Sequence, residues 1–218
     1  MGDIFYSIFL PIIYPMEAIF SFFWANTNSA GLSIILLALF ISILTIPFKK
    51  WARRIEDDFF ALKTLVDSEV AEKTTGLIGE ERFNIVEKIY KSHKYHPIKS
   101  VIAGTSFIVI IPFLISAIFI FSEAESLKGV SFLFISDLSA EDRLFVGLNV
   151  LPISMLLLGI GEALLRWRGQ REQIARYLIT AAVLFMLVYS FASALIIYWI
   201  SMNICASIIY YISNKTAK

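Results

Sequence analysis

Cysteine is almost missing from this sequence. Its 218 residues include only Cys205, so no disulfide can form within the chain. A disulfide framework of the kind that stabilises small secreted domains is therefore excluded. Cys205 lies inside an apolar run, where a small buried residue is the ordinary interpretation.

Positive charge is missing from the first 48 residues, because the first Lys or Arg is Lys49. The opening stretch, MGDIFYSIFLPIIYPMEAIF, begins with an acid and is interrupted by Pro11 and Pro15. A cleavable secretory signal starts with a positive region, so we expect this stretch to be retained.

Motifs of the common catalytic sites are also missing. The sequence has no Gly-rich phosphate loop, no nucleophile elbow and no paired catalytic acids, which predicts a protein that is not an enzyme and uses no cofactor. The two histidines, His93 and His96, form an H-x-x-H pattern among basic residues, without a nearby cluster of Cys or carboxylates. We interpret this pattern as a basic interfacial turn, with a metal site as the alternative.

Apolar sequence is what the chain has in excess. Hydrophobic residues make up 58% of it and charged residues 17%, and the mean hydropathy is +0.74. The apolar residues come in blocks of about 20, the length of a helix that crosses a bilayer. The sequence therefore predicts an all-α membrane protein, one domain over residues 1–218 with five transmembrane helices. The predicted spans are 30–48, 100–121, 147–164, 175–190 and 194–213.

Basic residues are distributed unevenly between these blocks. Of the nineteen, eleven lie from Lys49 to Lys99, two in the next loop, four from Arg166 to Arg176 and two in the tail. Because Lys and Arg concentrate in cytoplasmic loops, this pattern predicts an N-terminus outside the membrane and a cytoplasmic C-terminus. A four-span arrangement, with the tail outside, is the alternative.

Two segments are predicted not to span. Residues 3–25 are apolar but contain Pro11, Pro15 and Glu17, which favours a helix lying in the outer interface. Residues 50–95 carry two amphipathic patterns separated by TTGLIGEE, which predicts a cytoplasmic helical hairpin. The apolar positions of the patterns are Trp51, Ile55, Phe59, Leu62 and Val66, then Phe83, Val86 and Tyr90.

Four stretches carry a likeness to a known family, and they occur in the family's order. They are SAGLSIILLALFISILTIPFKK, HPIKSVIAGTSFIVIIPFLISAIF, FLFISDLSAEDRLF with LPISMLLLG, and SALIIYWISMNICASII. Each resembles a core span or the outer loop of the YidC/Oxa/Alb membrane protein insertases. The D-L-S-x-x-D element from Asp137 to Asp142 is part of this likeness, as are Tyr198 and Asn203.

The resemblance implies an inner-membrane core with a groove that is open to the cytoplasm and to lipid but closed outside. In the family this groove takes short polar segments of nascent or newly inserted membrane proteins part-way into the bilayer, without using a nucleotide. Such a notch helps because unsatisfied polar groups cost several kcal/mol each in hydrocarbon. The implied partners are these client proteins, with the ribosome or the translocon.

Small and polar residues at helical spacing are the candidates for lining the groove. In the first predicted span, Gly31, Ala38, Ser42 and Thr45 fall on one side of the helix. The candidate set is Ala38, Ser42, Thr45, Thr105, Ser116, Ser193 and Asn203. Helix packing is the alternative for the small residues, and an interhelical hydrogen bond is the preferred interpretation of Asn203.

Charged residues near the predicted spans give a second candidate set. Lys49, Lys50, Arg53 and Arg54 are candidates for substrate recruitment or ribosome contact. Contact with anionic lipids is their ordinary role, worth about 1 kcal/mol per residue near a charged surface. Glu162, the acid within a predicted span, is interpreted as a paired interfacial group near Arg166.

Three places depart from the family's pattern. The resemblance implies an Arg five positions before Pro47, where this sequence has Ser42. Ile110 stands where the family has a polar residue, and residues 192–194 stand where it has a Pro-Ser-Gly turn. These departures favour an alternative function, a partner or lipid-handling subunit of a dedicated membrane complex, for example in envelope polymer biosynthesis or export. A small transporter is a third alternative, for which the sequence offers no inverted repeat.

Overall fold

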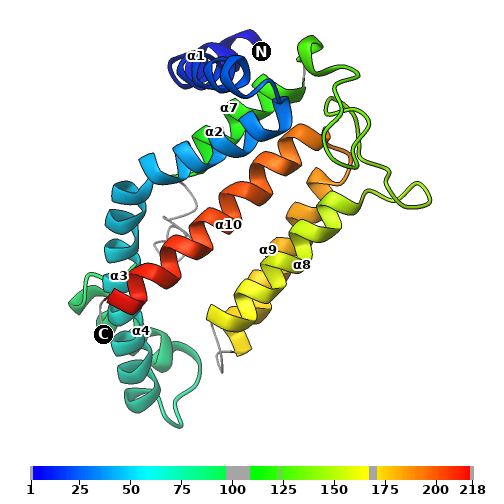
Figure 1. The fold of residues 1–218 in the computed structure, drawn as a ribbon. Helices are drawn as coiled ribbons and strands as arrows, with labels where there is room; N and C mark the ends of the chain where they lie inside the picture. The colour runs from blue at the N-terminus through cyan, green and yellow to red at the C-terminus, as the bar shows by residue number, and fades with distance from the viewer. Residues whose placement is uncertain (1, 97–108, 123, 167–170, 217–218) are drawn as a thin grey trace. The chain divides into compact units, whose positions relative to one another are not determined.

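The computed structural model describes residues 2–96, 109–122, 124–166 and 171–216, and these residues form helices joined by turns. No β-strand occurs among them, only isolated bridges in the loop after α7. The helices are α1 (Gly2–Thr27), α2 (Ala30–Leu44), α3 (Ile46–Lys73), α4 (Gly79–Ser92), α7 (Ile111–Ser122), η1 (Glu125–Leu127), α8 (Val150–Arg166), α9 (Arg171–Val188) and α10 (Ser193–Thr216) (Figure 1).

The chain divides into two compact units. Unit 1 comprises Met1–Leu44 and Pro112–Lys218, and unit 2 comprises Thr45–Ile111. Unit 1 therefore contains α1, α2 and α7 to α10, whereas α3 and α4 belong to unit 2.

Only one described helix, in its segment Tyr6–Thr27, is by itself long and apolar enough to cross a membrane. The broken pair Ala30–Leu44 and Ile46–Ala52 qualifies only when counted as one span. Shorter apolar helical segments are Ile111–Ser122, Val150–Leu165, Tyr177–Val188 and Ser193–Ile209. The apolar helices agree with the predicted class, an all-α membrane protein, whereas the number of five spans stays a prediction.

Two predicted spans begin or end differently in the structure. The span 30–48 is interrupted, because α2 ends at Leu44 and Pro47 lies in the first turn of a new helix, a position that tolerates proline. Much of the span 100–121 lies outside the described residues, and α7 covers the rest. α1 continues through Pro11 and Pro15 as one helix, and its predicted interfacial position stays a prediction.

α10 is the central helix of unit 1. It packs against α2 and α8, while α2 also packs against α1 and α8 against α9 (Figure 1). Its residues Ser193–Trp199 are all buried, so its first two turns are covered on every side. The residues of the adjoining core cluster are Met155, Val188, Ile196 and Trp199.

α2 buries its small residues together with three of its large apolar residues. Gly31, Ala38 and Ser42 are buried, whereas Ile43 and Leu44 are 54% and 48% exposed. Ile34, Leu37 and Ile41 are also buried, so the buried face of α2 is wider than its small residues alone. Small residues let two helix backbones approach closely, and large apolar residues on the outside suit a hydrocarbon surrounding.

In unit 2, α3 and α4 pack on one another through an apolar cluster. Val66, Ile89 and Tyr95 form its buried part, with Phe59 and Leu62 against it. The turn between the helices contains two glycines in the left-handed region, which favours glycine. Gly76 has a φ of 79°, and Gly79 has a φ of 65°. Trp51, Ile55 and Phe83, which belong to the same sequence patterns, are exposed instead.

Candidate functional site

Ser42 lies in the contact between α2 and α10, and Ala38, one turn earlier on the helix, is buried as well. Both are 0% exposed, and the Ser42 hydroxyl donates a hydrogen bond to Sδ of Met202, with 3.1 Å between the two atoms. A small polar residue that bonds across a helix pair is typical of packing in membranes. The Ser42 side chain therefore faces α10 and not the lipid.

Ser116 and Ser193 are also buried, and each bonds to a backbone carbonyl. The Ser116 hydroxyl donates to the Pro112 carbonyl one turn back at 2.8 Å, and the Ser193 hydroxyl donates to Ala140 at 2.7 Å. Ser and Thr in apolar helices often satisfy their hydroxyls in this way. Thr45 is 0% exposed, and Thr105 lies outside the described residues.

Burial along α10 changes near Asn203. No residue from Asn203 to Ile209 is buried, in contrast to the first two turns of the helix. Asn203 is half-buried, and its side-chain amide makes no hydrogen bond within the described part of the chain. Of the described groove candidates, Asn203 is therefore the one with a polar group free to meet water or a ligand.

The loop between α7 and α8 covers the first turn of α10. The backbone amides of Ser193 and Ala194 donate to the carbonyls of Ala140 and Leu138, at 2.8 and 2.9 Å. The first amides of a helix have no partner within the helix, so these bonds satisfy groups that burial would otherwise leave unpaired. The loop thus covers the start of α10.

Asp142, the last residue of the D-L-S-x-x-D element, caps α8. Its Oδ2 accepts hydrogen bonds from the amides of Val150 and Leu151, at 2.6 and 3.1 Å. Asn149 connects the same helix start to α9, because its amide donates to the Tyr189 carbonyl at 2.7 Å. The sequence element that carries the family likeness therefore organises helix starts in this structure.

Asp137 begins the element with a local turn. Its Oδ1 accepts from the amide and the hydroxyl of Ser139, at 2.8 and 2.7 Å. The hydrogen bond from the Ser139 side chain, followed by backbone donors, holds the pKa of Asp137 below its ordinary value. Hydrogen bonds from Asn149 and Arg143 likewise lower the pKa of Glu141.

A close approach between the loop and α2 explains Gly31. A Cβ added at Gly31 would stand 2.0 Å from Cγ of Phe132, inside the ring's contact distance. Gly31 is therefore required by the Phe132 ring, which lies directly on the helix backbone. Sequence spacing identified Gly31 as a small residue but gave no sign of its partner.

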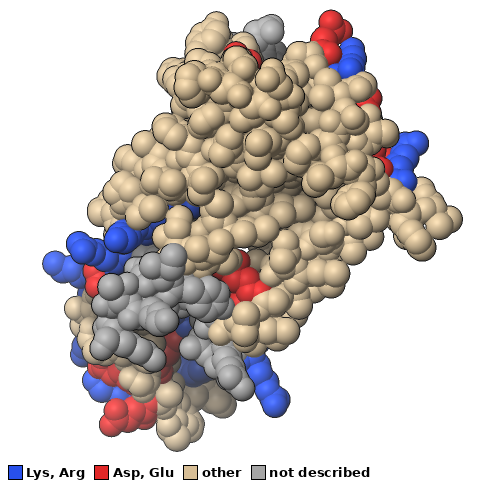
Figure 2. All heavy atoms as spheres, viewed as in Figure 1, with Lys and Arg blue, Asp and Glu red and all other residues tan. Residues whose placement is uncertain are grey.

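The basic candidates surround the start of α3. Lys50 and Arg54 are exposed and Lys49 is half-buried, while the Arg53 side chain lies outside the described residues. Glu162 on α8 is half-buried. Figure 2 shows that residues other than Lys, Arg, Asp and Glu form most of the visible face over α2, α10 and α8.

His93 contacts a carboxylate of α3. Its Nε2 lies 2.5 Å from Oε2 of Glu69, and His96 is exposed. Hydrogen bonds from Lys73, then from His93, lower the pKa of Glu69. Within the described ranges, no three His, Cys, Asp or Glu side chains gather as a metal site would require.

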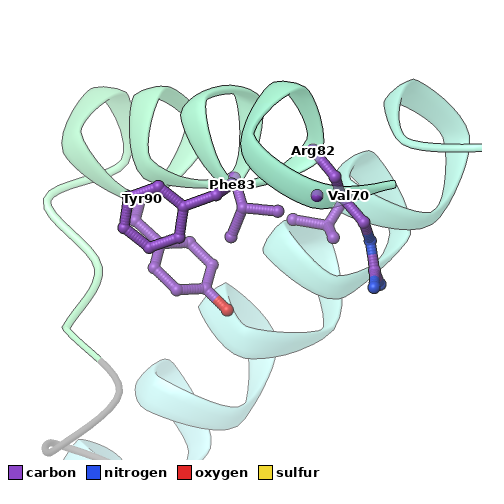
Figure 3. Close-up of a pocket in the computed structure, with 6 residues that line it drawn as sticks. Val70, Arg82, Phe83 and Tyr90 are labelled. Atoms are coloured by element: carbon purple, nitrogen blue, oxygen red, sulfur yellow. The ribbon is translucent and has the colours of Figure 1, made fainter. Parts of the chain in front are cut away.

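A depression of about 360 Å³ lies between α3 and α4 in unit 2 (Figure 3). Its lining is Val70, Gly79, Arg82, Phe83, Val86 and Tyr90. In Figure 3, the side chains of Phe83 and Tyr90 extend from α4, and that of Val70 extends from α3. It belongs to the same apolar interface that packs the two helices.

Sequence reasoning missed Asn149 and Asp142 as structural residues. Asn149 immediately precedes α8, and Asn before an apolar helical run is a known start signal. Asp142 lies too far from the helix start for such a local pattern to identify it, because the intervening turn folds back.

The fold and the site define a class, an all-helical membrane domain whose last apolar helix is enclosed at its first turns and partly exposed further on. Residues 22–218 match the family model described as 60Kd inner membrane protein. The chain belongs to this family, and the predicted likeness to the YidC/Oxa/Alb insertases is confirmed. Membership places it among inner membrane proteins.

Curated relatives carry the name membrane protein insertase YidC. The chain is 27% identical to that of Chlamydia trachomatis over 94% of its own length, which is 28% of the relative. It is 25% identical to that of Syntrophobacter fumaroxidans, over 97% of the chain and 39% of the relative. It is 27% identical to that of Magnetococcus marinus, over 96% of the chain and 37% of the relative. The chain thus spans less than half the length of these relatives.

Proposed function

We propose that this chain acts as a membrane protein insertase and chaperone that uses no nucleotide. The observation that carries the proposal is the match of residues 22–218 to the family, together with relatives named as insertases. The uneven burial of α10 supports a groove at its second half. In this proposal the clients are nascent or newly inserted membrane proteins.

The groove begins at Asn203 in this proposal. An amide in hydrocarbon needs a hydrogen-bond partner, and a polar client segment or water supplies one. The lining roles of Thr45, which is buried, and of Thr105 stay predictions from the sequence. Ala38, Ser42, Ser116 and Ser193 act as its packed wall, since each is buried. A polar notch lowers the cost of bringing a client's polar segment into the bilayer.

Orientation and surface contacts complete the proposal. The N-terminus lies outside and the C-terminus in the cytoplasm, with α3 and α4 as the cytoplasmic hairpin and α1 in the outer interface. Lys50 and Arg54, both exposed, meet anionic lipids, with the ribosome or translocon as further partners of Lys49 and Arg53.

The test is insertion of a small two-span protein into liposomes that contain the purified chain. Asn203→Leu is expected to lower the insertion rate by about tenfold, which corresponds to about 1.4 kcal/mol. Asn203→Gln, which keeps the amide, should retain most of the activity. Ile208→Leu, a change at an exposed apolar position of the same helix, is the matched control.

Failure of the unmodified chain to insert any small test protein would contradict the proposal. Equal insertion by Asn203→Leu and Ile208→Leu would contradict the role of Asn203 alone. The thermal stability of each variant in detergent, measured in parallel, shows whether lower insertion results from the missing amide or from unfolding of the variant.

A second candidate function follows from Ser42. The family likeness implies an Arg at this position, whereas Ser42 is buried against Met202 and adds no charge. This observation favours a partner or lipid-handling subunit of a dedicated membrane complex. Affinity purification from native membranes separates the two functions, because one stoichiometric partner would support the subunit, and nascent chains with ribosomes would support the insertase.

A further inference from the structure

The loop between α7 and α8 ends in two apolar turns that project from unit 1. Leu133 and Phe134 form the first tip and are 77% and 83% exposed, and Phe145 and Val146 form the second and are 67% and 90% exposed. In Figure 1 the yellow-green turn reaches beyond the helix ends, and Figure 2 shows its tip free of charged residues. These four residues are called the loop tips below.

Backbone hydrogen bonds fix the shape of both turns. The amides and carbonyls of Phe132 and Ile135 bond to each other at 2.9 and 3.0 Å, and the Leu148 amide donates to the Phe145 carbonyl at 2.8 Å. The exposed side chains therefore stand on closed, hydrogen-bonded turns. Their exposure is a property of a defined conformation.

The residue types at the tips conflict with the turns that hold them. Leu133 has a φ of 52° and Val146 a φ of 50°, in the left-handed region. Turns with positive φ at the first central residue favour Gly, Asn or Asp, and a β-branched residue such as Val is strained there. A strained apolar residue that packs against little of the chain has no local contact that offsets its strain, so the conflict points to a function at the tips.

The two tips lie next to the ends of apolar helices. Phe132, which precedes the first tip, packs on Gly31 in the first turn of α2. Val146 lies four residues before Val150, the start of α8, a distance of at most about 14 Å along an extended chain. If these helices occupy the bilayer, as membership in an inner membrane protein family indicates, the tips reach the headgroup region.

Polar residues between the tips complete an interfacial pattern. Asp137, Glu141 and Asp142 are engaged in the loop's own hydrogen bonds, while the tips carry no polar side chain. A surface with apolar points beside polar groups is typical of segments that lie at the boundary between headgroups and acyl chains. The chemistry at the points is purely hydrocarbon and aromatic, which matches lipid.

We propose that the loop tips, Leu133–Phe134 and Phe145–Val146, insert into the bilayer interface and anchor the loop that covers the first turn of α10. The partner is the lipid surface of the membrane in which the helices lie, and the inference does not depend on insertase activity. Anchoring would hold Ala140 and Leu138 over the start of α10, where they accept the helix's first amides.

The experiment places a fluorescent thiol label at each tip of the full chain. Cys205→Ser supplies the background, and Leu133→Cys or Val146→Cys carries the label, with Phe134 and Phe145 kept in place. Ser131→Cys and Ser136→Cys are matched controls, because both residues are exposed in the same loop. The vesicles contain phosphatidylethanolamine and phosphatidylglycerol, with or without lipids that carry a nitroxide on the acyl chain.

Lipid nitroxide is expected to quench the two tip labels at least about threefold more than the control labels, because the tips lie among acyl chains. Iodide in the buffer should show the opposite preference. Tip labels that iodide quenches as strongly as the controls would place the tips in water and overturn the proposal. Protection from both quenchers would overturn it as well, because protein would then cover the tips.

Discussion

At the scale of single residues, spacing in the sequence grouped the small residues of α2 on one side. It identified neither their contacts nor the large residues Ile34, Leu37 and Ile41 that are buried with them. The small residues Gly31, Ala38 and Ser42 are buried, which helical periodicity predicts. The ring of Phe132 on Gly31 and the sulfur of Met202 on Ser42 come from distant parts of the chain. A local pattern carries no information about such partners.

Replacing Gly31 by Ala is expected to destabilise the protein by about 1–3 kcal/mol, the usual cost of overpacking. The new methyl group would overlap the Phe132 ring, which stands 2.0 Å from its position. Gly161→Ala is the matched control, since an added Cβ there meets no atom within 4 Å. A thermal unfolding midpoint in detergent that is equal for the two variants would contradict the Gly31–Phe132 contact.

Replacing Val146 by Gly should leave the protein at least as stable in detergent, with a gain of up to about 1 kcal/mol. Glycine adopts positive φ without the strain of a β-branched residue, and its greater freedom in the unfolded chain offsets part of the gain. Val146 has a φ of 50° and is 90% exposed, so little packing is lost. A clear fall in the unfolding midpoint would show that Val146 makes stabilising contacts, which would contradict this prediction.

At the scale of elements, the apolar runs could be read as helices, but their ends could not. Thr45 divides the predicted span 30–48, because Pro47 fits the first turn of a new helix better than the interior of the old one. The apolar runs of α8 and α10 were predicted, but the groups that cap these helices were not. The caps come from a loop whose course depends on hydrogen bonds between residues far apart, such as Ser193 and Ala140.

The loop between α7 and α8 is expected to lose stability in acid. The pKa values of Asp137 and Glu141 are lowered by hydrogen bonds in the folded state, from ordinary values of 3.8 and 4.5. Carboxylates with lowered pKa stabilise the folded state above their unfolded pKa, and this contribution disappears as the pH falls through the folded pKa. The unfolding midpoint should therefore fall as the pH drops below about 4.5 and further below about 3.8.

Asp137→Asn tests this assignment. The variant should be less stable at neutral pH, and its midpoint should change less than that of the original chain on acidification. Parallel curves for the two proteins would show that Asp137 contributes nothing to the pH dependence. Lys128→Gln, a change at an exposed residue of the same loop, controls for altered charge.

At the scale of the whole molecule, composition and the order of motifs predicted the class and the family, because both depend on features spread along the chain. The residues that line the proposed groove are harder to predict. Most of its candidate residues are buried between helices, since small polar residues serve close packing as well as they serve a wet surface. Asn203 differs because an amide cannot satisfy itself on its own helix as readily as a hydroxyl can.

The central claim is that α10 has an enclosed first half and a second half that borders a polar groove. Its most direct test is thiol labelling in liposomes with a water-soluble maleimide, in a Cys205→Ser background. Three single replacements, Ala194→Cys, Asn203→Cys and Ile208→Cys, sample the enclosed turns, the proposed groove and the exposed apolar face. Labelling after unfolding in detergent gives the full reactivity of each thiol.

Only the thiol at position 203 is expected to react in the folded protein, because water reaches that position and is excluded from the other two. Protection of position 203, with full labelling after unfolding, would mean that no groove exists at this place on α10, and would contradict the account.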